Sequence, residues 1–359
     1  MRYLVLIIGL MAFTSCEEKS VKRELTIPAS YDASQYITNT TEELRLLDLL
    51  AELSTEMKKG RAGNQVDGQK LLEALIAFKP LTSSYYYNFI ETDLLPELIS
   101  ESRGIVFNPG TNGGVYGAYL FNKYGIENEQ RIEKGLYAAA FYQEARKLTR
   151  GQLKGTSSDK IVALFGAHPD FANSNSSSLH DNPDRFIANY VARRDKNNGD
   201  GYYTNIKNGL IKLQAAVNAG NDYQLEQEEA VQVIFENWEK GSAATAINYF
   251  YEVLGDLSVT SLDEASISSA MHSFSEILGF LQGFRTVDEK IITDEQIDEI
   301  LTLLNTPVEQ TPTTLNIINQ PVQEVPKLLE VVSKLKSIYK FTDTEMEDFK
   351  KNWVNEQQR

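Results

Sequence analysis

The segment that most constrains the fold is a long helix without a polar side. From about Tyr223 to Val253 the sequence has helical spacing, and from Ile234 onward apolar side chains occupy almost the whole circumference. A helix that is apolar all round is a buried helix. This chain therefore needs several other helices to enclose the one over Tyr223–Val253.

Helical spacing of apolar residues recurs through most of the remaining sequence, and almost no segment alternates with the period of two that indicates strands. We therefore predict an all-α fold, a single-domain helical bundle. The expected helices, besides the central one, cover Thr41–Lys59, Gly68–Phe78, Ser83–Ser102 with a kink at Pro96, Glu127–Leu148, Pro183–Lys196, Tyr203–Val217 and Ala270–Phe284. Two or three more are expected between Thr293 and Gln357, separated by a proline-threonine connector over Thr306–Pro326.

The N-terminus has the pattern of a secreted, lipid-anchored protein. After Arg2, the apolar run Leu4–Phe13 is too short to span a bilayer comfortably and is typical of a signal-peptide core. The run ends in Phe13-Thr14-Ser15-Cys16, which resembles the lipobox of bacterial lipoproteins. We predict a signal peptide over residues 1–15, a lipid-anchored tether and leading loop over 16–39, and a helical domain over 40–359, with lipid on Cys16.

Cys16 is the single cysteine, so an intramolecular disulfide is excluded. The acidic pair Glu17-Glu18 resembles the surface-export signal of Bacteroidota lipoproteins and favours an outer-membrane location that faces the cell surface, with the periplasmic face as the alternative. The formal net charge of −15 excludes a nucleic-acid partner, which would require a basic surface.

The best functional candidate is one face of the helix Ala270–Phe284. His272, Glu276, Gly279 and Gly283 follow one another at spacings of four, three and four residues, which places them in one line on a helix. A glycine in a helix costs about 1 kcal/mol relative to alanine. Two of them on one stripe indicate that another backbone approaches closely, so we expect His272 and Glu276 to be enclosed.

Enclosed polar groups need partners, and this pair admits two interpretations. Imidazole and carboxylate groups can ligate a transition metal such as iron, with Glu239 and Glu127 as candidates for the missing ligands. Alternatively, His272 and Glu276 form a structural contact inside the bundle. Glu127 also has a structural explanation, because an acidic residue at a helix start favours the helix dipole. A weaker loop site would combine four side chains: His168, Asp170, His180 and Asp181.

No strong catalytic motif occurs in this sequence. The glycine-rich loop Arg103–Gly117 lacks the spacing of a phosphate-binding loop, and no G-x-S-x-G is present. The spacing of His272 and Glu276 is not that of HExxH. We therefore expect a non-enzymatic protein. Trp238 is expected in the core, and Lys240 is expected to pair with Glu236 on the surface.

Five stretches, in this order, resemble blocks of a bacterial lipoprotein family, the domain of unknown function 4856. They are YDASQYITNTTEELRLLDLLAEL, GIENEQRIEKGLYAAAFYQEA, NPDRFIANYVARRDK, WEKGSAATAINYFYEVL and HSFSEILGFLQGFR. That family is distantly similar to imelysin-like proteins, which are helical envelope proteins associated with iron uptake and carry a GxHxxE signature. In this chain His272 and Glu276 are one residue further apart than in that signature.

The resemblance implies an imelysin-like architecture for the helical bundle. It also implies a lipoprotein that helps to acquire a metal or a metal chelate, beside a TonB-dependent outer-membrane receptor. Together with the residue patterns, it predicts a non-enzymatic binding or accessory lipoprotein. The alternative is a structural lipoprotein that docks on the receptor and has no ligand of its own. A metal-dependent hydrolase is a third possibility, which would need three ligands and an open coordination position.

Overall fold

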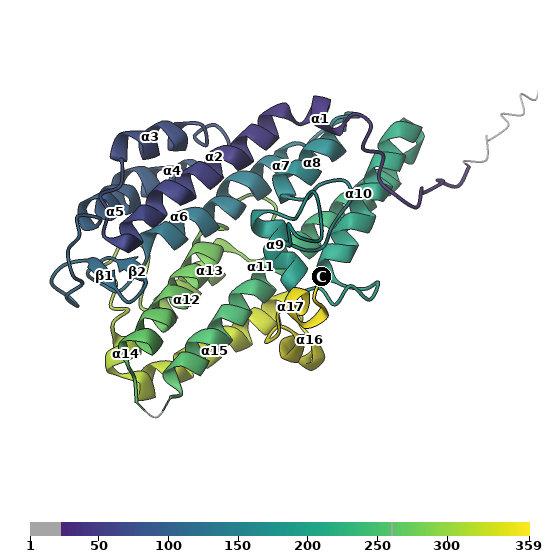
Figure 1. Ribbon diagram of the computed structural model, residues 1–359. Coiled ribbons are helices and arrows are strands. Elements are labelled where there is room, and N and C mark those ends of the chain that lie inside the picture. Colours follow the sequence, from purple (N-terminus) through teal and green to yellow (C-terminus); the bar gives the residue numbers. More distant parts are fainter. Residues whose placement is uncertain (1–22, 260) are drawn as a thin grey trace, which may run out of the picture.

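The long helix α11 (Gln224–Leu257) runs through the middle of a single helical domain in the computed structural model (Figure 1). The structure describes residues 23–259 and 261–359; the predicted signal peptide, Cys16 and Glu17-Glu18 lie outside them. The segments before α11 are α1 (Tyr36–Asn39), α2 (Thr41–Lys58), the 3-10 turn η1 (Lys59–Ala62), α3 (Gly68–Ile76), α4 (Ser84–Phe89), the π-helical η2 (Ile90–Leu94), α5 (Leu95–Glu101), β1 (Gly114–Tyr116), β2 (Tyr119–Phe121), α6 (Asn128–Leu136), the π-helical η3 (Tyr137–Tyr142), α7 (Gln143–Lys147), α8 (Ser157–Phe165), α9 (Phe186–Arg193), α10 (Tyr202–Ala219) and the 3-10 turn η4 (Asn221–Tyr223). Those after it are α12 (Glu264–Gln282), α13 (Asp294–Leu303), α14 (Asn316–Asn319), α15 (Pro321–Tyr339), α16 (Asp343–Asp348) and α17 (Trp353–Gln357).

The helices pack in a continuous series around α11. This helix contacts α10, α12 and α15, while α12 contacts α6, and α6 contacts α2. Trp238 of α11 is fully buried at the centre, with its ring 5.0 Å from that of Phe165 and 5.5 Å from that of Tyr142. The predicted all-α fold, the buried central helix and the core position of Trp238 are thus confirmed.

The glycine-rich loop forms the one paired sheet in the described part of the chain. Strands β1 and β2 are antiparallel, with Gly114 opposite Phe121 and Tyr116 opposite Tyr119. Gly114 has a φ of +158°, and a Cβ there would lie 2.3 Å from the Ile105 carbonyl oxygen. The glycine thus lets the preceding loop pack directly against the hairpin.

Pro96 interrupts its helix differently from the expected kink. The segment Ile90–Leu94 just before it is π-helical, and the Leu95 N–H bonds to the Ile90 carbonyl. Proline has no N–H to donate and its ring crowds the preceding turn, so the extra residue of a π turn relieves the helix at this point. The element continues as α5, with proline in its first turn.

The C-terminal part holds more helices than the sequence pattern indicates. The proposed connector Thr306–Pro326 was too long, because α14 lies within it and α15 already begins at Pro321. Proline is tolerated in the first helical turn, where its missing N–H has no partner in any case. The helix predicted from Pro183 begins only at Phe186, and α12 begins six residues before Ala270, at Glu264, where the Asp263 side chain caps it.

Part of the predicted tether belongs to the packed domain. The Tyr31 hydroxyl donates to Asp159 Oδ1 at 2.6 Å, and the buried Tyr36 hydroxyl donates to the Ala167 carbonyl. Burial raises the pKa of the Tyr31 hydroxyl, and its bond to Asp159 adds to the effect. The folded domain therefore starts near Tyr31. Among the described helices, none combines the length and the apolar character needed to cross a membrane.

Candidate functional site

The candidate face of α12 is packed against the backbone of α6. A Cβ added to Gly279 would lie 2.7 Å from the Gln130 carbonyl oxygen, and one added to Gly283 would lie 2.4 Å from the Gly135 carbonyl oxygen. No side chain fits at these distances, so the two glycines set the separation of the helices. The expectation of a close backbone approach along this stripe is confirmed.

His272 contacts Glu127 across this interface. The imidazole Nδ1 lies 2.6 Å from Glu127 Oε2, and the ring stacks on Tyr119 with the centroids 4.2 Å apart. Glu127 immediately precedes α6 with extended backbone, and its N–H donates to Ser275 Oγ at 2.8 Å. The carboxylate is fully enclosed while the imidazole is 19 % exposed. Two neighbouring helices thus fix this pair.

The second oxygen of Glu127 faces a permanent cation. Arg61 Nε of η1 lies 2.8 Å from Glu127 Oε1, as an ion pair without hydrogen-bond alignment, and its Nη2 contacts Glu129. Burial opposes the charge on Arg61, but Glu129 and Glu127 raise the pKa of its guanidinium. Glu127 is therefore held between Arg61 and His272.

Glu276 has a different cationic partner. Its Oε1 lies 3.4 Å from Lys134 Nζ and accepts a bond from the Tyr190 hydroxyl at 3.5 Å. Lys134 also pairs with Glu133 at 3.2 Å. Burial disfavours the ammonium, but the Glu133 carboxylate outweighs burial and raises the pKa of Lys134 well above its ordinary value. Glu276 therefore forms a buried ion pair between α12 and α6.

Glu239 lies at another place in the fold. Its oxygens accept from the Ile291 N–H at 2.7 Å, the Ile292 N–H at 2.8 Å and the Tyr339 hydroxyl at 3.1 Å. Burial raises the pKa of Glu239, although these hydrogen bonds oppose the shift. The carboxylate anchors the loop after α12 on α11 and has little capacity left for another ligand.

The four predicted metal ligands are thus divided among three places. The structure joins His272 to Glu127, places Glu276 on Lys134, and separates Glu239 from both. Within residues 23–259 and 261–359, no group of three or more His, Cys, Asp or Glu side chains is positioned to hold a metal ion. Among the same described residues, His168 forms an ion-pair contact with Asp170 at 2.8 Å and with no other carboxylate. Arg61 and Lys134 place positive charges beside Glu127 and Glu276, and these charges oppose the binding of a bare metal cation there.

Sequence patterns did not reveal the buried ion pairs between α6 and its neighbouring elements. Glu129, Glu133 and Lys134 lie in the charged segment NEQRIEKGL, which resembles a solvent-exposed helix, yet every residue of α6 is buried. The charges of Glu133 and Glu129 are matched by Lys58 and Arg61, which lie about 70 residues earlier in the chain. Lys134 pairs with Glu133 itself and with Glu276 of α12. The two glycines facing α6 were the only sequence signal for this burial.

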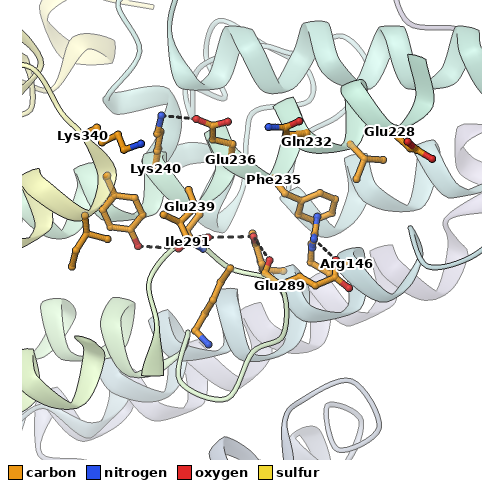
Figure 2. A pocket seen from close by; sticks show the side chains of 15 residues that line it. Arg146, Glu228, Gln232, Phe235, Glu236, Glu239, Lys240, Glu289, Ile291 and Lys340 are labelled. Carbon is orange, nitrogen blue, oxygen red and sulfur yellow. Dashed lines mark hydrogen bonds and ion pairs between the residues drawn. The ribbon is translucent and has the colours of Figure 1, made fainter. Parts of the chain in front are cut away.

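A cavity of about 540 Å³ opens beside Glu239, between α11, the loop 285–293 and the end of α15 (Figure 2). We call it the α11–α15 cavity. Its wall is largely apolar and aromatic, and is made by Tyr142, Val231, Phe235, Ile291, Ile338 and Tyr339. Pockets of this volume and character accept small organic molecules.

Most charged side chains around this cavity form ion pairs. Figure 2 shows Lys240 on Glu236, at 2.6 Å as the sequence predicted, and Arg146 beside Glu289. Lys340 is exposed and has no ion-pair partner among the residues that the structure describes. It follows α15 with a φ of +57°. The lining therefore offers apolar surface together with the ammonium group of Lys340. It also holds the Glu228 carboxylate, which accepts a hydrogen bond from Gln224 at 3.0 Å and has no ion-pair partner among the described residues.

No family model, curated protein or solved structure matches this chain. The resemblance to the lipoprotein family consequently stays a prediction, and a function has to be argued from the described sites.

Proposed function

We propose that this chain is an outer-membrane lipoprotein, anchored through Cys16 and facing the cell surface, that binds a metal in the form of an organic chelate. The ligand occupies the α11–α15 cavity, and the protein works as a non-enzymatic accessory to a TonB-dependent receptor. The observation that carries this proposal is the combination of an aromatic wall with the unpaired ammonium of Lys340.

The division of the predicted ligands favours a chelate over a bare ion. A transition metal bound by protein needs several imidazole, thiolate or carboxylate donors at one point. His272 and Glu127 supply two donor groups, but Arg61 adds a positive charge 2.8 Å from the carboxylate. An organic chelate brings its own donor atoms and requires only a shaped cavity, aromatic surface and a complementary charge.

The same contacts support a binding role without catalysis. A catalytic base has to reach a substrate, whereas Glu127 is fully buried between Arg61 and His272, and Glu276 is paired with Lys134. Both pairs have the geometry of contacts that hold α12 on α6. The alternative function, receptor docking without a ligand, is favoured by the adjacent apolar residues Ile105 and Val106, which are 42 % and 76 % exposed.

Calorimetric titration of the full chain in detergent tests the proposal. The probes are a ferric tris-catecholate complex, ferric citrate, and Fe²⁺ alone under anaerobic conditions. We expect a chelate to bind and Fe²⁺ alone not to bind. Val231→Trp fills the cavity and should abolish binding, and Lys340→Gln should weaken it about tenfold.

Two control variants make this result specific. Lys334→Gln removes a lysine of the same helix that is already paired with Glu299 at 2.8 Å, and it should bind like the wild type. His272→Ala should also retain binding. Loss of binding in His272→Ala, or unchanged binding in a folded Val231→Trp, would contradict the proposed location.

A further inference from the structure

A second cavity of about 570 Å³ lies at the other end of α6 from the π-helical η3. It is enclosed by η2, α6, the end of α12 and the segment 306–312. We call it the Arg131 pocket. Its lining combines the rings of Tyr85, Phe89 and Tyr124 with polar groups, which include Asp93, Glu97, Arg131 and Gln282.

The guanidinium of Arg131 is buried in this lining without a carboxylate partner. Arg131 is 6 % exposed, and its Nε and Nη2 both donate to the neutral Gln282 Oε1, at 3.0 and 2.9 Å. The Phe89 ring lies 4.8 Å from its central carbon. Within the described part of the chain Arg131 forms no ion pair, although guanidinium groups stay charged and bury unfavourably when they are unpaired.

Carboxylate oxygens without partners line the same cavity. Glu97 accepts bonds from Asn122 at 2.9 Å and from Asn128 at 2.7 Å, both on Oε2, so its Oε1 has no bond from a described residue. Asp93 accepts from the adjacent Thr92 hydroxyl on Oδ2 alone. The lining therefore presents an unpaired cation and unpaired acceptor oxygens together.

We propose that the Arg131 pocket binds an α-amino acid or a short peptide with both termini unblocked. The ligand carboxylate pairs with Arg131, and its ammonium contacts Glu97 and Asp93. A simple anion would be repelled by these carboxylates, and a simple cation by Arg131, whereas a zwitterion satisfies both. The volume leaves room for a side chain or further residues beside the aromatic rings.

The backbone supports the placement of the acidic wall. Thr92, Asp93 and Leu94 belong to the π-helical η2 and line the pocket. Single π turns within helices frequently occur at functional sites, because the extra residue changes which side chains face inward. This site is separate from the α11–α15 cavity and does not depend on the proposed chelate function.

Calorimetry on the full chain with four probes tests this proposal: unblocked tri-alanine, N-acetylated tri-alanine, C-amidated tri-alanine and acetate. We expect the unblocked peptide to bind and each blocked form to bind at least tenfold more weakly. Equal binding of blocked and unblocked peptides, or acetate binding as tight as that of the peptide, would overturn the zwitterion assignment.

Three variants test which side chains contact the carboxylate and the ammonium group of the ligand. Arg131→Met keeps an apolar contact with Phe89 and should lose peptide binding while it still folds, because replacing an unpaired buried charge by an apolar side chain is commonly tolerated. Glu97→Gln keeps the size of the side chain and should reduce the preference for the unblocked over the acetylated peptide, with Asp93 as the remaining carboxylate. Arg150→Met changes an arginine that pairs with Asp288 at 2.9 Å and does not line the pocket, so it should bind like the wild type. Wild-type selectivity in Glu97→Gln would refute the role of that carboxylate even if Arg131→Met failed to fold.

Discussion

Substitution of Gly279 by alanine tests the packing of α12 on α6. Alanine in the middle of a helix gains about 1 kcal/mol over glycine through helix propensity. The new Cβ, however, would lie 2.7 Å from both the Gln130 carbonyl oxygen and Lys134 Cβ. Overpacking of this kind costs about 1–3 kcal/mol, and a contact with backbone belongs at the upper end. The expected net result is a loss of about 2 kcal/mol in the free energy of unfolding.

Gly255 of α11 provides the matched control. A Cβ there would have no neighbour within 4 Å, so Gly255→Ala should gain stability by up to about 1 kcal/mol from propensity alone. Equilibrium unfolding in guanidinium chloride measures both variants. We expect a lower midpoint for Gly279→Ala and a higher one for Gly255→Ala. A rise of the midpoint in Gly279→Ala would refute the close approach of the two helices.

Three further predictions concern buried carboxyl groups. Glu133→Ala should lower the free energy of unfolding by about 3 kcal/mol in denaturant titration, because it takes one carboxylate from the buried Lys134; a loss below 1 kcal/mol would contradict this. Glu239→Leu should lower the free energy of unfolding by about 1–3 kcal/mol and speed hydrogen exchange at the Ile291 and Ile292 amides. Unchanged exchange at these two amides would contradict this prediction. Burial, reinforced by Glu97, raises the pKa of Glu101 from 4.5 to about 9. At pH values between these two pKa values, the unfolded chain binds fewer protons than the folded chain, so the free energy of unfolding should fall as pH rises from about 5 to 9. Glu101→Gln should reduce this pH dependence in melting curves.

The periodicity of apolar residues was sufficient to predict the all-α architecture. The apolar circumference of α11 predicted its central position, and the glycines of α12 predicted a close backbone neighbour. Both conclusions rest on interactions within one helix or along one stripe, which are visible in a local window. The same logic failed for the C-terminal prolines, because Pro321 begins α15 where a proline is also compatible with a loop.

The contacts of the candidate residues were less predictable. Glu127 was a candidate partner of His272 and does lie beside it, but no sequence pattern indicated that Arg61 would pair with its second oxygen. Whether a charged segment such as α6 is buried depends on cations from distant helices. The α11–α15 cavity similarly depends on how Glu239 fixes the loop after α12, and no local pattern encodes that contact.

An iron anomalous-difference map from crystals grown with the ferric tris-catecholate complex locates the bound metal. We expect a single iron peak in the α11–α15 cavity, near Phe235 and Lys340, surrounded by the density of the chelator. An iron peak between His272 and Glu276, coordinated by those side chains, would contradict it.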